Sequence, residues 1–143
     1  MRLTASQKKQ LAVLLKREHA LAGAFLFGSQ AKGTAGLLSD VDVAVVFRSS
    51  VPVKKRARVT RDLFIKAARM LGTDHIDLFD AAAVSSVLLR YNALVHGTLL
   101  FAADASAVHA ARFRAVQDYE DFRPHLVTQE RLIKRKVAAY GSR

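Results

Sequence analysis

Apolar and polar positions along the chain follow two periods, which together predict helices and short strands. Near the N-terminus, leucines recur at helical spacing among lysines, and Thr4 followed by Gln7 matches a capping box, so we predict a helix over residues 4–19. Residues 23–27 and 41–47 are short apolar runs that are typical of buried strands. The stretch between these runs predicts a short helix or a loop.

The remainder of the chain continues this alternation of helices and strands. Pro52 suits the first turn of a helix and Gly72 suits its end. Beyond Asp104 the apolar stripe predicts helix, which Pro124 breaks or restarts. The other predicted elements are a strand over residues 76–79, a helix over 82–96 and a strand over 98–101.

This order of elements predicts an α/β or α+β fold with one small mixed sheet of about four strands flanked by helices. The length of 143 residues suits one domain with its own core. We expect a core over residues 1–103. Residues 104–143 form a helical extension that packs on this core or on a partner.

Composition narrows the class of protein. No apolar run approaches the roughly 20 residues that span a bilayer, and the first residues lack the pattern of a signal peptide. The absence of cysteine excludes disulfides, zinc–thiolate sites and cysteine nucleophiles. We therefore expect a soluble cytoplasmic protein. The net charge of +11 predicts attraction to an anionic partner.

Basic residues concentrate in two segments, residues 53–69 and 131–136. Each segment is either a solvated helix face, a surface for a protein partner or a contact for RNA. Basic clusters without interleaved aromatic residues are poor evidence for base recognition. The sequence leaves these alternatives open.

The segment "FLFGSQAKGTAGLLSDVDVAVVF" places two carboxylates, Asp40 and Asp42, within an otherwise apolar run. Residues two apart in a strand share a face, so these side chains project together while Val41, Val43 and Val45 pack the opposite face. Carboxylate oxygens suit Mg²⁺, or Mn²⁺ in its place. The pair predicts a site that holds metal ions for in-line displacement at phosphorus.

The Gly28-Ser29 turn lies at the end of the first predicted strand. Glycine allows a phosphate to approach the backbone, serine offers a hydroxyl, and Lys32 follows one turn later. Alone, a Gly-Ser turn or a pair of exposed acids is an ordinary feature of a surface. Both motifs together, in this order and between two strands, favour a nucleotide site.

Gly28-Ser29, ten residues and then Asp40-Val41-Asp42 resemble the signature of the DNA polymerase β-type nucleotidyltransferase superfamily. The short chain is similar to the minimal members, the MNT-domain antitoxins that accompany HEPN-domain ribonuclease toxins. "HIDLFDAAAVSSVLLRYNALVHGTLLFAAD" and "FRAVQDYEDFRP" are similar to the later parts of that domain. The resemblance covers roughly residues 8–126 and implies a polymerase β-like palm fold with a C-terminal helical tail.

The resemblance also implies a third acid on the neighbouring strand, for which Asp74, Asp77 and Asp80 are candidates. We choose Asp77 because it lies inside the predicted strand, as the third acid of the family does. The implied catalytic and metal-binding residues are thus Asp40, Asp42 and Asp77. A buried cluster of three carboxylates would have raised pKa values without a cation.

Ser39 joins the implied nucleotide-binding residues Gly28, Ser29 and Lys32. His75 lies two residues before Asp77, so its side chain borders the site if side chains alternate between the two faces of the strand. The resemblance implies ATP as donor and a tyrosine hydroxyl of the cognate HEPN toxin, bound in a complex, as acceptor of AMP. The alternatives are an antitoxin that acts by binding alone, a transferase for a small molecule and an RNA-binding module.

Overall fold

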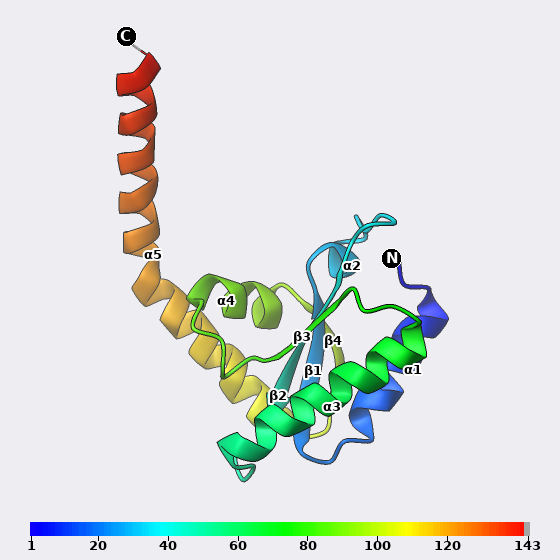
Figure 1. Cartoon of the computed structure of the whole chain (residues 1–143). Coiled ribbons are helices and arrows are strands. Elements are labelled where there is room, and N and C mark those ends of the chain that lie inside the picture. Colours follow the sequence, from blue (N-terminus) through cyan, green and yellow to red (C-terminus); the bar gives the residue numbers. More distant parts are fainter. Residues whose placement is uncertain (142–143) are drawn as a thin grey trace.

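The computed structural model describes residues 1–141, with side chains through Ala139. Within this range the chain forms one four-stranded sheet and five helices (Figure 1). In chain order they are α1 (Ala5–Lys16), β1 (Leu21–Phe27), α2 (Ser29–Lys32), β2 (Val41–Phe47), α3 (Val53–Leu71), β3 (Ile76–Asp80), α4 (Val87–Val95), β4 (Thr98–Ala102) and α5 (Ala105–Gly141).

The sheet is mixed, with strand order β3-β2-β1-β4. β1 pairs antiparallel with both β2 and β4, whereas β3 runs parallel to β2. The parallel pair is joined by α3, as a parallel connection requires a crossover. The predicted fold class, a small mixed sheet flanked by helices, is confirmed.

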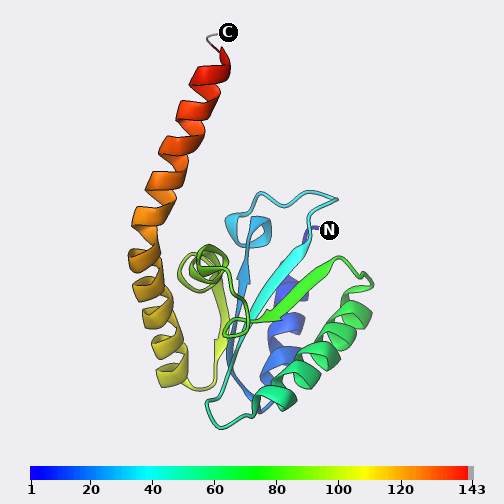
Figure 2. The same ribbon diagram turned by 60° about the vertical axis from the view of Figure 1, so that its left-hand side comes forward.

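Each face of the sheet has its own hydrophobic core (Figure 2). On one face, Val41, Val43 and Val45 of β2 pack with buried residues of α1 and α3. On the other face, Ala44 and Val46 pack with buried residues of α4 and α5. The predicted alternation of β2 is therefore confirmed, and Asp42 belongs to the face that α4 and α5 cover.

Local signals set several of the helix ends. The Thr4–Gln7 capping box forms, with Thr4 Oγ1 accepting from Gln7 N at 3.1 Å and Gln7 Oε1 accepting from Thr4 N at 2.9 Å. Gly72 ends α3 in the left-handed conformation. The prediction for α4 began too early, because Ser86 caps that helix by accepting from Leu89 N.

The prediction that Pro124 breaks the last helix is wrong, since α5 is one helix with Pro124 inside it. Proline removes one backbone donor and bends a helix without necessarily ending it. Figure 1 shows that α5 changes direction where it leaves the core and then projects away from it. Among the described residues, no helix is both long and apolar enough to cross a membrane.

Candidate functional site

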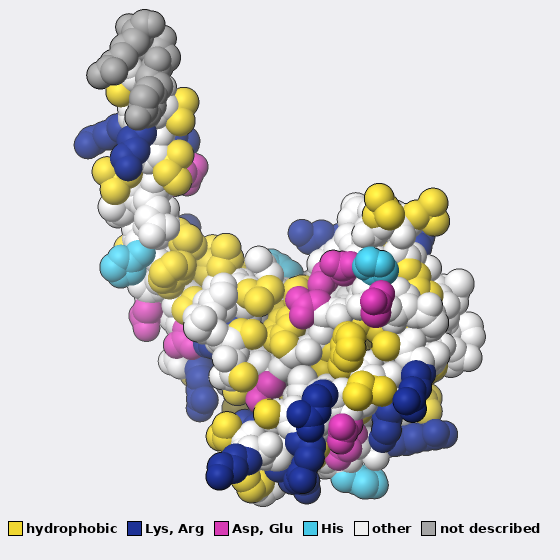
Figure 3. Space-filling view, in the orientation of Figure 1, with side chains coloured by type: hydrophobic (Ala, Val, Ile, Leu, Met, Phe, Trp, Pro, Cys, Tyr) yellow, Lys and Arg dark blue, Asp and Glu magenta, His cyan; other side chains and the backbone are white. Residues whose placement is uncertain are grey.

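Three aspartates are neighbours at the end of the sheet where β2 and β3 begin. The parallel register sets Asp42 directly opposite Asp77, and Asp40 lies immediately before β2. In Figure 3 acidic side chains gather around a histidine on the globular part of the molecule. The structure therefore brings together the three aspartates that the sequence singled out.

The surroundings of Asp42 differ from those of the other two aspartates. Asp42 is partly buried, whereas Asp40 and Asp77 are exposed. Burial raises the pKa of Asp42 above its ordinary value of 3.8, and the negative charges of Asp77 and then Asp40 raise it further. The expected buried cluster is thus an open one, with solvent access to two of its carboxylates. A cation here would relieve the repulsion on Asp42.

Gly28 provides the space beside the Asp42 carboxylate. Its φ of 68° and ψ of −147° belong to a region that residues with a side chain rarely adopt. A Cβ on this residue would lie 2.5 Å from Asp42 Oδ2. The Gly-Ser turn and the Asp42 carboxylate therefore pack closely, because the Asp42 side chain occupies the place that a Cβ of residue 28 would need.

The remaining predicted nucleotide-binding residues lie in α2 and in the loop that follows it. Ser29 begins α2, the partly exposed short helix after β1, and the exposed Lys32 ends it. Ser39 has a local structural task, because its Oγ accepts from Gly36 N at 2.9 Å and so shapes the loop before Asp40. All three lie in the segment that joins β1 to β2.

His75 borders the cluster as its position in sequence indicated. Its Nδ1 lies 3.6 Å from Asp40 Oδ1, and its Nε2 lies 3.9 Å from Asp74 Oδ1. Both side chains of the first pair are largely exposed, at 73% for His75 and 59% for Asp40. Asp74 is therefore a neighbour of the histidine, outside the strand pairing that places Asp77.

Asp80 lies at the other end of β3, opposite Val45. Its Oδ1 accepts from Ala82 N at 2.9 Å, which holds the turn after the strand. Burial raises the pKa of this carboxyl, while the hydrogen bond and the charge of Arg56 act in the opposite direction. Asp80 lines a cavity of about 670 Å³ that none of the three clustered aspartates lines.

Sequence reasoning missed Gln30, which is buried although it is polar. Its Oε1 accepts from Leu3 N at 3.1 Å, and its Nε2 donates to Met1 O. The side chain thus fastens the N-terminal segment to α2 beside the site. A glutamine within a Gly-Ser-Gln-Ala segment carries no signal for this role, because its partners are nearly 30 residues away.

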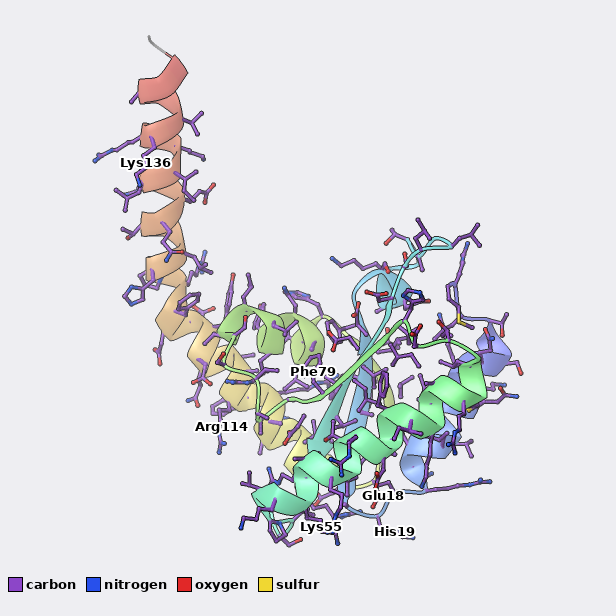
Figure 4. The ribbon with its side chains drawn as sticks, viewed as in Figure 1. Glu18, His19, Lys55, Phe79, Arg114 and Lys136 are labelled. Atoms are coloured by element: carbon purple, nitrogen blue, oxygen red, sulfur yellow. The ribbon has the colours of Figure 1, made fainter. Side chains whose placement is uncertain are left out.

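Sequence reasoning also missed the contacts between α4 and α5. Arg90 donates to Ala81 O and Val84 O and pairs with Asp118 at 3.1 Å. Tyr91 stacks on Tyr119, with ring centroids 3.9 Å apart. These contacts hold α4 over the face of the sheet that carries Asp42, where Phe79 also lies (Figure 4).

The donor set fits a hard divalent cation, because its side-chain donors are carboxylate oxygens. In the described residues no three acidic or histidine side chains form a ready-made set of metal ligands. The fit therefore rests on the strand register of Asp42 and Asp77 and on the repulsion that raises the pKa of Asp42. Asp40, Asp42 and Asp77 are the residues that would hold such an ion.

Solved structures with the same fold come from toxin–antitoxin complexes. A toxin–antitoxin structure with AMP-PNP is 24% identical, with a TM-score of 0.63 over 92% of this chain and 98% of that one. An MntA–HpeT mutant, whose name records two aspartates changed to glutamate, is 23% identical, with a TM-score of 0.66 over 92% and 98%. An MNT antitoxin with a tri-AMPylated HEPN toxin from Shewanella oneidensis is 22% identical, with a TM-score of 0.61 over 93% and 97%.

No protein with a curated function matches the chain. The family model described as "Polymerase beta, Nucleotidyltransferase" matches residues 9–106, which extend from α1 to the start of α5 and include all three aspartates. This range is more than half of the 143 residues. The chain belongs to the polymerase β nucleotidyltransferase family.

Proposed function

We propose that this protein is a Mg²⁺-dependent antitoxin that transfers AMP from ATP to a tyrosine hydroxyl of a cognate HEPN ribonuclease toxin. The observation that carries the proposal is the parallel register of Asp42 with Asp77, next to Asp40 and the Gly28 turn. Transfer of AMP to the toxin would block its active site. We place this activity in the cytoplasm.

The three carboxylates divide into two tasks in the proposed reaction. Asp40 and Asp42 would hold the cation, and Asp77 would be a further ligand or the base that accepts the proton of the attacking hydroxyl. Mg²⁺ bound there would neutralise charge on the phosphate oxygens. The tyrosine oxygen forms a bond to the α-phosphorus, the bond from that phosphorus to the bridging oxygen breaks, and pyrophosphate leaves.

The remaining site residues assist in binding the nucleotide. Gly28 has no Cβ that would displace the Asp42 carboxylate, Ser29 supplies a hydroxyl, and the exposed Lys32 supplies positive charge. Ser39 shapes the loop before Asp40 through its hydrogen bond with Gly36. Positioning and electrostatic stabilisation account for catalysis in such a site, without a covalent intermediate on the protein.

Membership of the family and the chemistry of the structural neighbours support this proposal. One neighbour is described with AMP-PNP and another with a tri-AMPylated HEPN toxin. A third carries substitutions of two aspartates by glutamate. The first two descriptions agree with a nucleotide ligand and with a HEPN protein as the acceptor of AMP.

The test is incubation of the protein with labelled ATP, Mg²⁺ and a cognate HEPN protein, followed by mass spectrometry of the partner. We expect a mass increase of one or more AMP units for the wild type and none for Asp42→Asn. Asp62→Asn, which changes an exposed carboxylate of α3, is the matched control and should remain active. Binding and neutralisation without transfer would instead identify an antitoxin that acts by binding alone.

A further inference from the structure

An apolar stripe runs along one face of α5 and continues beyond the core. Val108 and Ala115 on this face are buried, at 4% and 1% exposure. The same helical face continues, at spacings of three, four and seven residues, with Tyr119, Phe122, Leu126, Ile133 and Val137. Exposure rises along the stripe, to 62% at Ile133 and 66% at Val137. A face that is core at one end of the helix is thus unpartnered at the other.

The stripe is oriented by its contacts with α4. The Tyr91–Tyr119 stack and the Arg90–Asp118 pair fix the face of α5 that turns toward α4. Among the described residues, this ring stack and this ion pair lie at residues 118 and 119 of α5, and Figures 1 and 2 show the later part of the helix projecting away from the core, toward the end of the molecule where α2 lies. We call residues 123–137 the arm. Its apolar face continues, along the same helix, the face of α5 that is buried against the core.

The charge of the arm indicates which kind of surface would bind to it. Five basic residues lie in it against one acidic residue, Glu130, which pairs with Lys134 at 3.1 Å. Figure 4 shows Lys136 pointing away from the core. A second copy of the same arm would bring like charges together, which opposes self-association. A protein surface with apolar side chains flanked by carboxylates complements both properties of the arm.

We propose that the arm is the docking surface for the protein that accepts the nucleotide, and that this partner presents an apolar stripe with acidic flanks. The inference rests on the proposed function for the identity of the partner. Docking there seats the partner on the side of the molecule from which the arm and the carboxylate end both project. The acceptor hydroxyl is then delivered to Asp40, Asp42 and Asp77 by a contact outside the nucleotide site.

The experiment compares three variants for affinity to the HEPN protein and for AMP transfer. In Ile133→Ser/Val137→Ser we expect affinity to fall by about tenfold or more, since two aliphatic side chains lose their burial at the interface. Val13→Ser is the matched control, because Val13 is also an exposed helical valine, at 51%. Lys134→Glu/Lys136→Glu should slow association and weaken its dependence on salt. ATP binding should be unchanged in all three.

The outcomes separate the arm from the catalytic proposal. If the two arm variants bind the HEPN protein with the affinity and association rate of the wild type, the arm is not the docking surface. The proposal that the wild type transfers AMP is unaffected by this outcome. If the wild type binds the HEPN protein, the arm variants do not, and no variant transfers AMP, the arm is supported as the docking surface and the catalytic proposal is refuted. The arm proposal is overturned if light scattering shows that the isolated protein is a dimer and that Ile133→Ser/Val137→Ser abolishes this dimer. It is also overturned if the wild type does not bind the HEPN protein.

Discussion

Replacement of Gly28 by alanine should damage both the fold and the site, for two separable reasons. Its φ of 68° with ψ of −147° is accessible almost only to glycine, and a side chain there costs about 1–3 kcal/mol. The new methyl group would also lie 2.5 Å from Asp42 Oδ2, so the carboxylate must move. We expect the melting temperature to fall by roughly 3–10 °C and AMP transfer to be lost.

Two other glycines in the same segment separate these effects. Gly33 has a φ of 73° but open space around it, so Gly33→Ala carries only the conformational cost, about 1–2 kcal/mol. Gly36 also has open space and lacks a positive φ, so Gly36→Ala should leave stability within about 0.5 kcal/mol or increase it slightly. Thermal and urea unfolding measure stability, and mass spectrometry of the partner measures transfer.

The reasoning requires that stability and AMP transfer respond differently in the two variants. Gly33→Ala should lose stability and keep its transfer activity, whereas Gly28→Ala should lose both. Equal stability of the Gly28 and Gly33 variants, together with wild-type transfer by Gly28→Ala, would refute the coupling between this turn and the Asp42 carboxylate.

Three further predictions follow from the site. The raised folded-state pKa of Asp42 means that its protonated form favours folding, a contribution that is full below about pH 3.8 and lost as pH rises through the folded pKa. In calorimetry, Asp42→Asn should therefore unfold at a higher temperature than the wild type at pH 7 and at a similar temperature at pH 3. A lower unfolding temperature of Asp42→Asn at pH 7 would contradict the unfavourable charge of Asp42 in the folded protein. Asp77→Asn should abolish transfer and Asp80→Asn should retain it, and the opposite ranking in the AMP assay would assign the third acid to Asp80. Gln30→Ala should lower the free energy of unfolding by about 1–3 kcal/mol in urea, because Leu3 N loses its partner; an unchanged midpoint would show that the segment is held otherwise.

The features that the sequence predicted correctly depend on neighbours along the chain. The capping box of Thr4 and Gln7 involves residues three apart, and Gly72 ends α3 through its own backbone conformation. The bounds of β2 follow from its alternation of valines with other residues. Resemblance to a family supplied the choice of Asp77, since strand order cannot be deduced from periodicity alone.

The features that remained hidden depend on residues far apart in the chain. Arg56 belongs to a segment that charge alone presents as a solvated helix face, yet it donates to Val51 O and Arg48 O and lies 5.7 Å from the Phe47 ring centroid. Arg90 likewise binds carbonyls and Asp118. Pro124 was expected to break a helix that continues through it. For the two arginines the tertiary environment overrides the local preference, whereas the exposed Pro124 shows that a proline can lie inside a continuous helix.

The division of β2 between two faces allows stability and chemistry to be altered independently. Changes at Val43 or Val45 act on the packing beneath α1 and α3, whereas a change at Asp42 acts on the opposite side of the same strand. A folded protein that has lost its chemistry can therefore be made with one isosteric substitution, which provides a stable bait for trapping a bound partner. Deletion of a single residue within the strand, by contrast, would move the aspartate to the face beneath α1 and α3 and the valines to the face beneath α4 and α5, so that both properties are lost together.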